Sequence, residues 1–288
     1  MKAEVKNFGK CTKVMEGNGR VIRLDQETLR KVQMTELELL EEVDRICRKC
    51  GINYCIIAGT LLGAVRHGGF IPWDDDADVA LLRREYEKFC EACKEELDTS
   101  RFYFQDYKST PGYRWGYGKL RKKGTIFFRE NQEHMPYEQG IFIDIFPLDN
   151  TPENYLLRCI HNFECFVYRK FLWSEVGKIA DKKWFMRRIY QLMSLVPEKK
   201  IKKFFCNFIQ SSNRKESSWV RILSFPTPNH VFGYRKAWYE DLEEIKFEGK
   251  KFWGIRDYDA YLKFKFGDYM KLPPMNQRKV HPVSKIEV

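Results

Sequence analysis

A run of aspartates at residues 74–78, DDDAD, has the composition of a metal-binding motif. In an extended strand alternate side chains point to the same side, so Asp74, Asp76 and Asp78 are expected to share one face. Carboxylates on one face repel one another unless a cation lies between them, and hard oxygen ligands suit Mg²⁺ or Mn²⁺. The alternative, a solvated acidic turn, does not explain why residues 79–82 are all apolar. We therefore predict a divalent-metal site, with Asp76 and Asp78 as ligands and Asp74 as a further candidate.

A phosphate-binding pattern precedes the aspartates. Gly59 and Thr60 follow the apolar run 54–57, which predicts a buried strand. A glycine lets backbone N–H groups approach a phosphate closely, and the threonine hydroxyl can donate a further hydrogen bond. Arg66 and His67 are additional candidate phosphate partners. A phosphate-holding turn followed by a carboxylate pair indicates metal-assisted chemistry on a phosphate.

A second informative stretch is IFIDIFPLD at residues 141–149. Asp144 is the only charge between residues 141 and 148, and a lone carboxylate in a buried strand is unfavourable unless it is paired or metal-bound. We predict that Asp144 is a third metal ligand; the alternative is a structural partner for an arginine or a backbone donor. Asp149 stands beside Thr151-Pro152, a pattern typical of a helix start, so we expect a capping or structural role for it.

Two basic residues, Lys119 and Arg121, alternate onto one face of a predicted strand at 117–121. They could contact a diphosphate, or they could form a solvated basic face. The sequence favours neither interpretation.

Composition restricts the broad class. The chain has 288 residues, enough for one large domain or two small ones, and no apolar run approaches the ~18 residues that span a membrane. The start lacks the apolar segment of a secretory signal, and nine scattered cysteines fit a reducing cytoplasm, where we expect the protein. Two C-x-x-C pairs, Cys47/Cys50 and Cys90/Cys93, suggest zinc, but both fall on the apolar stripe of a predicted helix, which favours buried free thiols.

Positive charge is concentrated in residues 155–215, which hold fourteen Lys and Arg against four acidic residues. This segment carries +10 of the total net charge of +11 and predicts two or three helices rich in aromatic residues. Such a surface needs an anionic partner: membrane lipid, a phosphate-rich polymer or nucleic acid. Interleaved basic and aromatic residues favour peripheral contact with the inner face of an anionic membrane, or an acceptor polymer. The alternative is a helical subdomain with a solvated basic exterior.

The elements that must position these residues can be predicted in outline. Residues 1–24 are expected to form a loosely structured arm with a turn at 17–19, and residues 25–288 one domain. Asp25 is a plausible N-cap for a helix to Cys50, and Gly51 a stop. Further expected elements are a strand at 53–57, helices at 84–98 and 257–265, and short strands within 101–130. The predicted fold is α/β: a mixed sheet flanked by helices, with a basic helical insertion at about 155–215.

The pattern of Gly59-Thr60, then Asp76-Ala77-Asp78, then the distant Asp144 resembles the nucleotidyltransferase superfamily. The sequence GTLLGAVRHGGFIPWDDDADV at residues 59–79 is similar to the corresponding motif of the LicD family, which includes bacterial phosphocholine transferases and the domain of fukutin-related protein. IFIDIFPLD and the late FGDYMKLPP also match bacterial members of that family. The resemblance covers roughly residues 28–282. Ala77 departs from the Ile or Val that is common there, and the basic helices carry the least resemblance.

The resemblance implies metal-dependent transfer of a phospho-alcohol, commonly phosphocholine from CDP-choline, to a sugar hydroxyl, with release of CMP. The acceptor would be a glycan or glycolipid such as a teichoic acid, lipopolysaccharide or capsule precursor. On this basis Asp76 and Asp78 hold one or two Mg²⁺ or Mn²⁺ ions, and Asp144 completes the site and takes the acceptor proton. Gly59 and Thr60 hold phosphate, and the remaining binding candidates are Arg66, His67, Lys119 and Arg121.

A choline cargo would need an aromatic cage for its quaternary ammonium. Trp73 lies next to the aspartates, and Tyr113, Trp115 and Tyr117 lie near Lys119, but 15% aromatic residues make such neighbours common by chance. A CDP-glycerol or CDP-ribitol donor would instead need hydrogen-bonding groups.

Two other functions fit the same residues. A nucleotidyltransferase adding nucleotides to RNA or a small molecule would share the acid triad, but the sequence has no recognisable RNA-binding motif, so nucleic acid is not expected as a partner. A non-catalytic membrane scaffold would use the basic helices alone, and the intact triad argues against it.

His281 in the C-terminal tail is expected on the surface.

Overall fold

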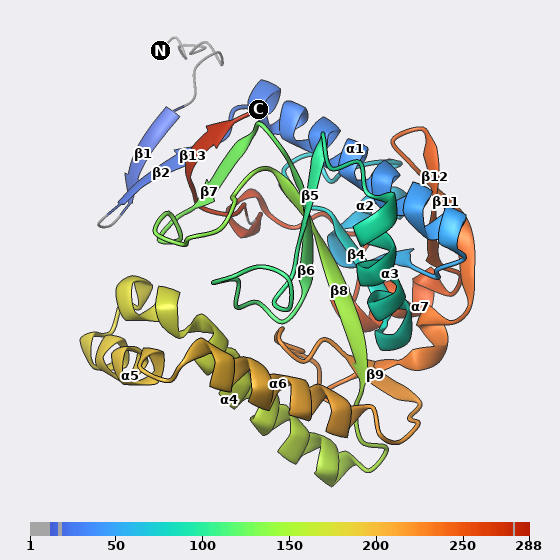
Figure 1. The fold of residues 1–288 in the computed structure, drawn as a ribbon. Helices are drawn as coiled ribbons and strands as arrows, with labels where there is room; N and C mark the ends of the chain where they lie inside the picture. The colour runs from blue at the N-terminus through green and yellow to red at the C-terminus, as the bar shows by residue number, and fades with distance from the viewer. Residues whose placement is uncertain (1–11, 17–18, 279) are drawn as a thin grey trace.

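The computed structural model describes residues 12–16, 19–278 and 280–288 and has a mixed α/β fold, as predicted (Figure 1). The strands of its central sheet are β3 (Cys55–Ile56), β4 (Asp78–Leu82), β5 (Phe102–Gln105), β6 (Gly118–Lys122), β8 (Phe142–Asn150), β9 (Trp219–Arg221), β10 (Tyr234–Arg235), β11 (Leu242–Phe247) and β12 (Lys250–Ile255). Their order is β10-β9-β8-β4-β3-β12-β11, with β6 also paired to β8 and β5 to β6. The β4–β8 and β3–β12 pairs are parallel and the others antiparallel, so the sheet is mixed.

The helices are α1 (Gln26–Cys50), α2 (Ala58–His67), α3 (Arg83–Glu96), α4 (Tyr155–Ala180), α5 (Trp184–Ser194), α6 (Glu198–Ser212) and α7 (Tyr258–Phe266), with short 3₁₀ turns η1 (Lys236–Tyr239) and η2 (Met275–Gln277). Helices α1 and α3 pack together over β4, β6 and β8, whereas α2 and α7 pack together over β4, β11 and β12. Within the described residues, no helix combines the length and the apolar character needed to cross a bilayer.

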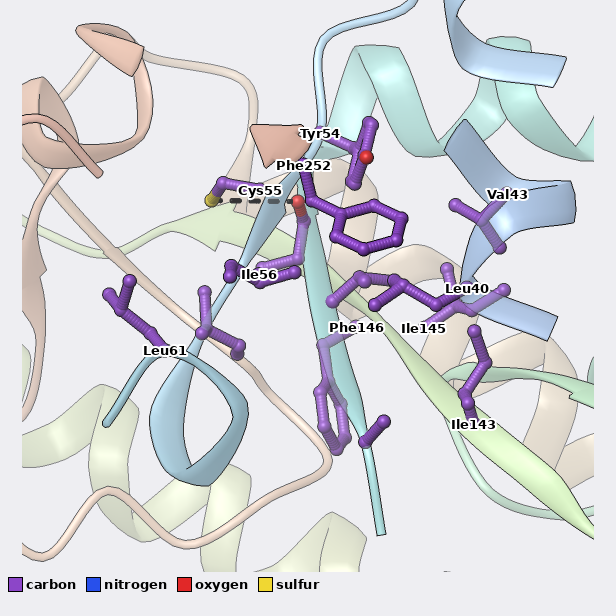
Figure 2. Packing of buried hydrophobic residues seen from close by; sticks show 14 of the residues in the cluster. Leu40, Val43, Tyr54, Cys55, Ile56, Leu61, Ile143, Ile145, Phe146 and Phe252 are labelled. Carbon is purple, nitrogen blue, oxygen red and sulfur yellow. Dashed lines mark hydrogen bonds between the residues drawn. The ribbon is translucent and has the colours of Figure 1, made fainter. Parts of the chain in front are cut away.

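Helix α1 begins and ends where its capping residues predict. The Asp25 carboxylate accepts a hydrogen bond from the Thr28 amide at 2.7 Å, and Gly51 closes the helix with a left-handed φ of +62°. Leu40 and Val43 lie on one side of β3 and β4, toward Ile143 of β8, and Leu61 of α2 lies on the other side (Figure 2). Both faces of this part of the sheet are therefore buried.

The described part of the N-terminal arm, residues 12–16 and 19–24, is not the loose segment predicted. Strands β1 (Thr12–Glu16) and β2 (Gly19–Arg23) pair antiparallel, and β2 joins β13 (Val283–Glu287), which pairs with β7 (Ile126–Arg129). Residues 17 and 18 of the predicted turn lie outside the described residues. Strand β2 is thus paired with a strand from the far end of the chain, which no local pattern indicates.

Helix α3 and the short strands of 101–130 lie close to where they are predicted. Cys47 of α1 and Cys93 of α3 are both buried, as their positions on apolar stripes predict, whereas Cys50 is exposed. Asp149 has the expected structural role, because its carboxylate accepts two hydrogen bonds of 2.6 Å from the Arg83 guanidinium. It does not cap a helix.

The predicted helix start at Thr151-Pro152 is wrong. Helix α4 begins at Tyr155, and the Asn154 side chain accepts hydrogen bonds from the amides of residues 156 and 157. The Thr151 amide instead donates to the Trp219 carbonyl, which extends the β8–β9 pairing by one residue and delays the helix.

The basic segment forms three helices, α4, α5 and α6, as predicted (Figure 1). Helices α4 and α6 contribute to a second hydrophobic cluster, separate from the main core of the sheet, that includes Cys165, Leu172, Phe205 and Phe208. This cluster also takes in Tyr113 from the loop before β6, so the helices are held against the sheet domain by apolar contacts.

His161 in this helical layer is expected to make stability depend on pH. Its ring lies between Thr151 Oγ1 at 3.3 Å and Ser212 Oγ at 2.9 Å, and burial, aided by the Arg221 guanidinium, lowers its pKa to about 4. The unfolded chain binds a proton at this histidine below about pH 6.5, whereas the folded chain does not until about pH 4. The free energy of unfolding should therefore fall by about 3 kcal/mol between these values.

Urea unfolding at several pH values measures this loss. His161→Gln should remove most of it, and His134→Gln, at an exposed histidine, should leave it intact. Identical pH profiles for the wild type and His161→Gln would contradict the assignment.

Candidate active site

Three adjacent strands place a row of charged side chains on one face of the sheet. Asp78 of β4 is directly opposite Asp144 of β8, and Asp144 is directly opposite Lys119 of β6. Directly paired residues on neighbouring strands point to the same side, so the three side chains are neighbours. The Lys119 ammonium donates to the Asp144 carboxylate, and both side chains are about 95% buried. Two of the three predicted acids, Asp78 and Asp144, are thus brought together by strand register.

Asp74 and Asp76 join this row from the segment that leads into β4. Burial raises the pKa of Asp74 to about 8, with the Asp76 carboxylate adding to the effect. Burial also raises the pKa of Asp78 well above its ordinary value, reinforced by Asp76 and Asp144. Each of these carboxyls is therefore disfavoured as an anion, first by burial and then by its neighbours, which is the situation that a bound cation would relieve.

The aspartates do not all lie in a strand as predicted. Strand β4 begins only at Asp78, and residues 74–77 precede it as an irregular segment. The alternation nevertheless persists, since Asp75 and Ala77 are buried while Asp74, Asp76 and Asp78 are partly exposed. The shared face was predicted correctly, but the segment lacks a partner strand along residues 74–77.

Gly59 and Thr60 lie in the first turn of α2 rather than in an open turn. The Thr60 hydroxyl accepts a hydrogen bond from the Asp78 amide at 2.8 Å, so it positions the strand that carries the acid. A Cβ on Gly59 would lie 2.7 Å from the Asp74 carboxylate, so any other residue there would have to shift that carboxylate. Ala58 just before has a φ of +51°, a strained left-handed conformation that turns the chain sharply from β3 into α2.

Arg66, His67 and Trp73 form a second group at the other end of α2. Along α2, Arg66 and His67 lie about 10 Å from the N-terminal turn that holds Gly59 and Thr60. The Arg66 guanidinium donates to the Tyr269 carbonyl at 2.7 Å and to the His67 ring at 3.0 Å. The Arg278 guanidinium carbon lies 4.1 Å from the centre of the Trp73 ring, so one face of that ring is already covered by a cation.

Lys119 and Arg121 share a face of β6 as predicted, but that face is not solvated. Both side chains are about 95% buried. Arg121 donates to the Gln105 side chain at 2.8 Å and to the Gly140 carbonyl at 2.7 Å. Burial lowers the pKa of Lys119 to about 7, although the Asp144 carboxylate opposes this. The solvated-face interpretation is therefore wrong for both residues.

Three residues near the acids were not predicted as part of the site. Glu36 of α1 is buried below the aspartates, and burial, with Asp76 adding to it, raises its pKa well above the ordinary value. His281, expected on the surface, is half-buried, and its ring nitrogen lies 3.0 Å from Asp75 and 3.6 Å from Asp76. The Arg129 guanidinium is electrostatically coupled to Asp144 and Asp76.

The chemistry of these donors fits a divalent cation. Asp74, Asp76, Asp78 and Asp144 offer hard oxygen ligands, and the buried Oε2 of Glu36 has no hydrogen-bond partner among the described residues. Within that part of the chain, however, no three His, Cys, Asp or Glu side chains already form a complete ligand set. In this conformation Asp144 is paired with Lys119 instead.

A cavity of about 520 Å³ adjoins the charged row, and Lys119 belongs to both. Its remaining lining is largely aromatic and basic. These residues come from the segment before β6, from β7 and the turn after it, from α4, α5 and the link between them, and from residues 224–226. They are Trp115, Tyr117, Arg129, Gln132, Phe166, Arg169, Lys170, Leu172, Trp173, Asp181, Tyr190, Ser224, Phe225 and Pro226. Four cations against one acid favour an anionic ligand, and flat aromatic walls favour a base or an organic cation.

A mixed α/β sheet with buried carboxylates beside a basic, aromatic cavity is an arrangement suited to a phosphate-containing ligand, and comparison with known proteins shows which family the chain resembles. Residues 51–162 match the family model described as LicD/FKTN/FKRP, nucleotidyltransferase domain. The lipopolysaccharide cholinephosphotransferase LicD of Haemophilus influenzae is 26% identical over 271 residues, which cover 89% of this chain and 96% of the relative. An uncharacterized protein of Rickettsia prowazekii is 23% identical over 169 residues, 57% of this chain and 58% of that protein. The chain therefore contains a segment that matches the LicD family model, and it is similar over most of its length to a LicD protein.

The family match includes much of the site. Gly59, Thr60, Asp76, Asp78, Lys119 and Asp144 all lie within residues 51–162. Helices α5 and α6 and most of α4 lie outside it, as does His281.

Proposed function

We propose that this enzyme transfers a phospho-alcohol, with phosphocholine as the first candidate, from a CDP-linked donor to a sugar hydroxyl of a lipopolysaccharide-type glycan. The observation that carries the proposal is the Asp78–Asp144–Lys119 row beside a basic and aromatic cavity. The name of the Haemophilus influenzae relative supports choline as cargo and lipopolysaccharide as acceptor.

In the proposed reaction, the acceptor oxygen forms a bond to the phosphorus that carries the alcohol. The bond from that phosphorus to the bridging oxygen breaks, and CMP leaves with the bridging oxygen. Asp144 takes the proton of the acceptor hydroxyl, and the Lys119 ammonium and Arg129 guanidinium compensate charge on the diphosphate. Thr60 holds the Asp78 backbone in position.

Mg²⁺ or Mn²⁺ held by Asp76, Asp78 and Asp144, with Asp74 as a further candidate, would neutralise the developing charge on the transferred phosphate. The raised pKa values of Asp74, Asp76 and Asp78 support this ligand set, because a cation favours the charged carboxylates.

The test is nucleotide release by purified protein with MgCl₂ or MnCl₂, using CDP-choline, CDP-glycerol, CDP-ribitol, CTP and ATP. Each donor is offered with lipopolysaccharide, teichoic acid, capsule precursor or no acceptor. We expect CMP from CDP-choline, fastest with lipopolysaccharide, and none with EDTA or in Asp78→Ala. Pyrophosphate from CTP or ATP would instead indicate nucleotide addition.

The choline cage hypothesis gives a separate prediction. Trp115 lies 5.5 Å from Trp173, centre to centre, in the cavity wall, whereas Trp73 is stacked by Arg278. Trp115→Ala should raise the KM for CDP-choline about 10-fold, corresponding to a desolvated cation–π contact, and Trp73→Ala should have a smaller effect. The KM for CDP-glycerol, which has no ammonium, is the control. If neither variant changes the KM for CDP-choline, the cage hypothesis fails.

The close approach of Gly59 to Asp74 can be tested in the same assay. In Gly59→Ala the new methyl group must displace the Asp74 carboxylate, so CMP release should fall about 10- to 100-fold with little change in the unfolding midpoint. Because the added methyl group would meet only the Asp74 side chain, adding Gly59→Ala to Asp74→Ala should have almost no further effect. Full activity in Gly59→Ala would show that the position of Asp74 is unimportant.

A further inference from the structure

Helix α5 packs closely against α4 but against little else. Tyr190 is its only buried residue, and its ring packs on α4 at Gly177, where an added Cβ would lie 2.6 Å away. The Lys170 ammonium of α4 donates to the Tyr190 hydroxyl at 2.8 Å. Helix α5 is thus held to α4 along one narrow line and presents its other sides outward (Figure 1).

The outward side of α5 is largely apolar. Phe185, Ile189 and Leu192 follow one another at helical spacing and are 45%, 44% and 69% exposed. Trp184 at the start is 70% exposed and Leu195 just past the end is 76% exposed. Side chains of this kind are normally covered, and a continuous exposed row of them marks a contact surface.

Helix α4 continues the same apolar surface. Gly177 and Lys170, which α5 covers, belong to a row at helical spacing that runs back through Phe163 and Ile160 to Leu156. These last three side chains lie beyond the part that α5 covers and are 65%, 59% and 71% exposed. Because α5 lies on this row, its outward side and the uncovered part of the row face the same direction. We name the two together, residues 156, 160, 163, 184, 185, 189, 192 and 195, the apolar face.

Positive charge surrounds the apolar face. Residues 182–197 contain Lys182, Lys183, Arg187 and Arg188 and no acidic residue, and all four basic side chains are exposed. Arg187 and Arg188, with Lys178, also line a shallow hollow of about 480 Å³ beside Trp184. An amphipathic helix with aromatic and aliphatic side chains on one side and Lys and Arg beside them is typical of helices that lie in the surface of an anionic membrane.

We propose that the apolar face docks onto an anionic lipid bilayer, with α5 lying in the plane of the headgroups. Nucleic acid would pair with the cations but would leave Ile189, Leu192 and Leu195 in water, whereas a bilayer accommodates both. Lys170 and Tyr190, which join α4 to α5, also line the cavity beside Asp144, so docking holds that cavity close to the lipid. If the proposed function is correct, the acceptor is a glycan carried on a membrane-anchored lipid.

Flotation of the full-length protein with vesicles tests the docking directly. Vesicles of phosphatidylglycerol and phosphatidylcholine in equal parts are compared with vesicles of phosphatidylcholine alone. We expect binding to the anionic vesicles, at least 10-fold weaker binding to the neutral ones, and loss of binding at high salt. No binding to the anionic vesicles, or equal binding to both kinds, would overturn the proposal.

Two double variants locate the contact. Ile189→Glu with Leu192→Glu, and Arg187→Glu with Arg188→Glu, should each weaken vesicle binding at least 10-fold. The matched controls are Met275→Glu, at an 80% exposed apolar residue elsewhere, and Arg84→Glu, at an exposed arginine of α3, and both should bind as the wild type does. Wild-type binding by either α5 variant would overturn the assignment to α5.

Folding and catalysis are separated from docking by two further measurements. Because the substituted side chains are exposed, the unfolding midpoint should not change. The α5 variants should also keep wild-type CMP release with a water-soluble oligosaccharide acceptor. If the proposed function is wrong, the wild type itself will release no CMP. If only the docking proposal is wrong, CMP release will be normal and the flotation assay alone will fail.

Discussion

Asp78→Asn is expected to lower the rate of CMP release at least about 1,000-fold, a barrier increase of about 4 kcal/mol. Asp78 is the residue that β4 places directly beside Asp144, and its amide is held by the Thr60 hydroxyl at 2.8 Å. Asparagine keeps the shape of the side chain but removes the charge, so the loss would report on electrostatics rather than on packing. Single-turnover CMP release, at a saturating concentration of donor and metal ion, measures it.

The same substitution should leave stability unchanged or raise it in metal-free buffer. Burial and the carboxylates of Asp76 and Asp144 already disfavour a charged Asp78, and a neutral amide avoids that repulsion. Added Mn²⁺ should raise the unfolding midpoint of the wild type but have little effect on Asp78→Asn, because a bound ion stabilises the folded state by mass action. An inactive variant of normal or higher stability would separate a site effect from misfolding.

Asp241→Asn is the matched control, since Asp241 is exposed and pairs with Arg256 on the surface. It should keep full activity and the full response to Mn²⁺. Asp76→Asn should behave as Asp78→Asn does, and an Asp76→Asn enzyme that keeps half the activity would contradict the assigned metal site.

Features encoded by neighbouring residues could be predicted accurately. Both ends of α1 follow from Asp25 and Gly51, because a cap is a contact within three or four residues. Asp144 stands out because a single charge interrupts an apolar run, and β8 is indeed buried along its whole length. The family resemblance rests on the same kind of contiguous signal, the stretch from Gly59 to Val79.

Features that depend on which segments meet in space could not be predicted. The side chain that pairs with Asp75 belongs to His281, 206 residues away, and nothing near either residue indicates the contact. Alternation places Lys119 and Arg121 on one face, but only the pairing of β6 with β8 shows that this face is buried and that Lys119 meets Asp144. Glu36 lies on α1 and reaches the aspartates only through packing of that helix.

The basic helices lie between these two cases. Their existence and charge follow from composition, but exposure of the apolar side chains of α5 follows from how little of that helix α4 covers. A hydrophobic residue at helical spacing ordinarily predicts burial. In α5, side chains at this spacing face outward. The sequence alone could therefore not distinguish a solvated basic exterior from a surface that contacts a membrane.

The largest effect on stability is expected at the buried ion pair of Arg83 and Asp149. The guanidinium of α3 donates two hydrogen bonds of 2.6 Å to the Asp149 carboxylate of β8, and the Asn213 amide donates a third of 2.6 Å. Asp149 is 1% exposed, so Arg83→Met would leave a carboxylate buried without its cation. We expect a loss of about 3–5 kcal/mol in the free energy of unfolding, measured by urea denaturation.

The double variant Arg83→Met with Asp149→Leu shows whether this loss comes from the unpaired charge. Removing both charges also removes the desolvation cost of each, so the double variant should recover most of the stability. The exposed pair of Arg256 and Asp241 is the control, where Arg256→Met should cost less than about 1 kcal/mol. Asp149 lies five residues from Asp144 along β8, about 17 Å, so Arg83→Met should keep its activity at temperatures where it remains folded. A loss below 1 kcal/mol in Arg83→Met would mean that water reaches Asp149 and that the pair does not hold α3 to the sheet.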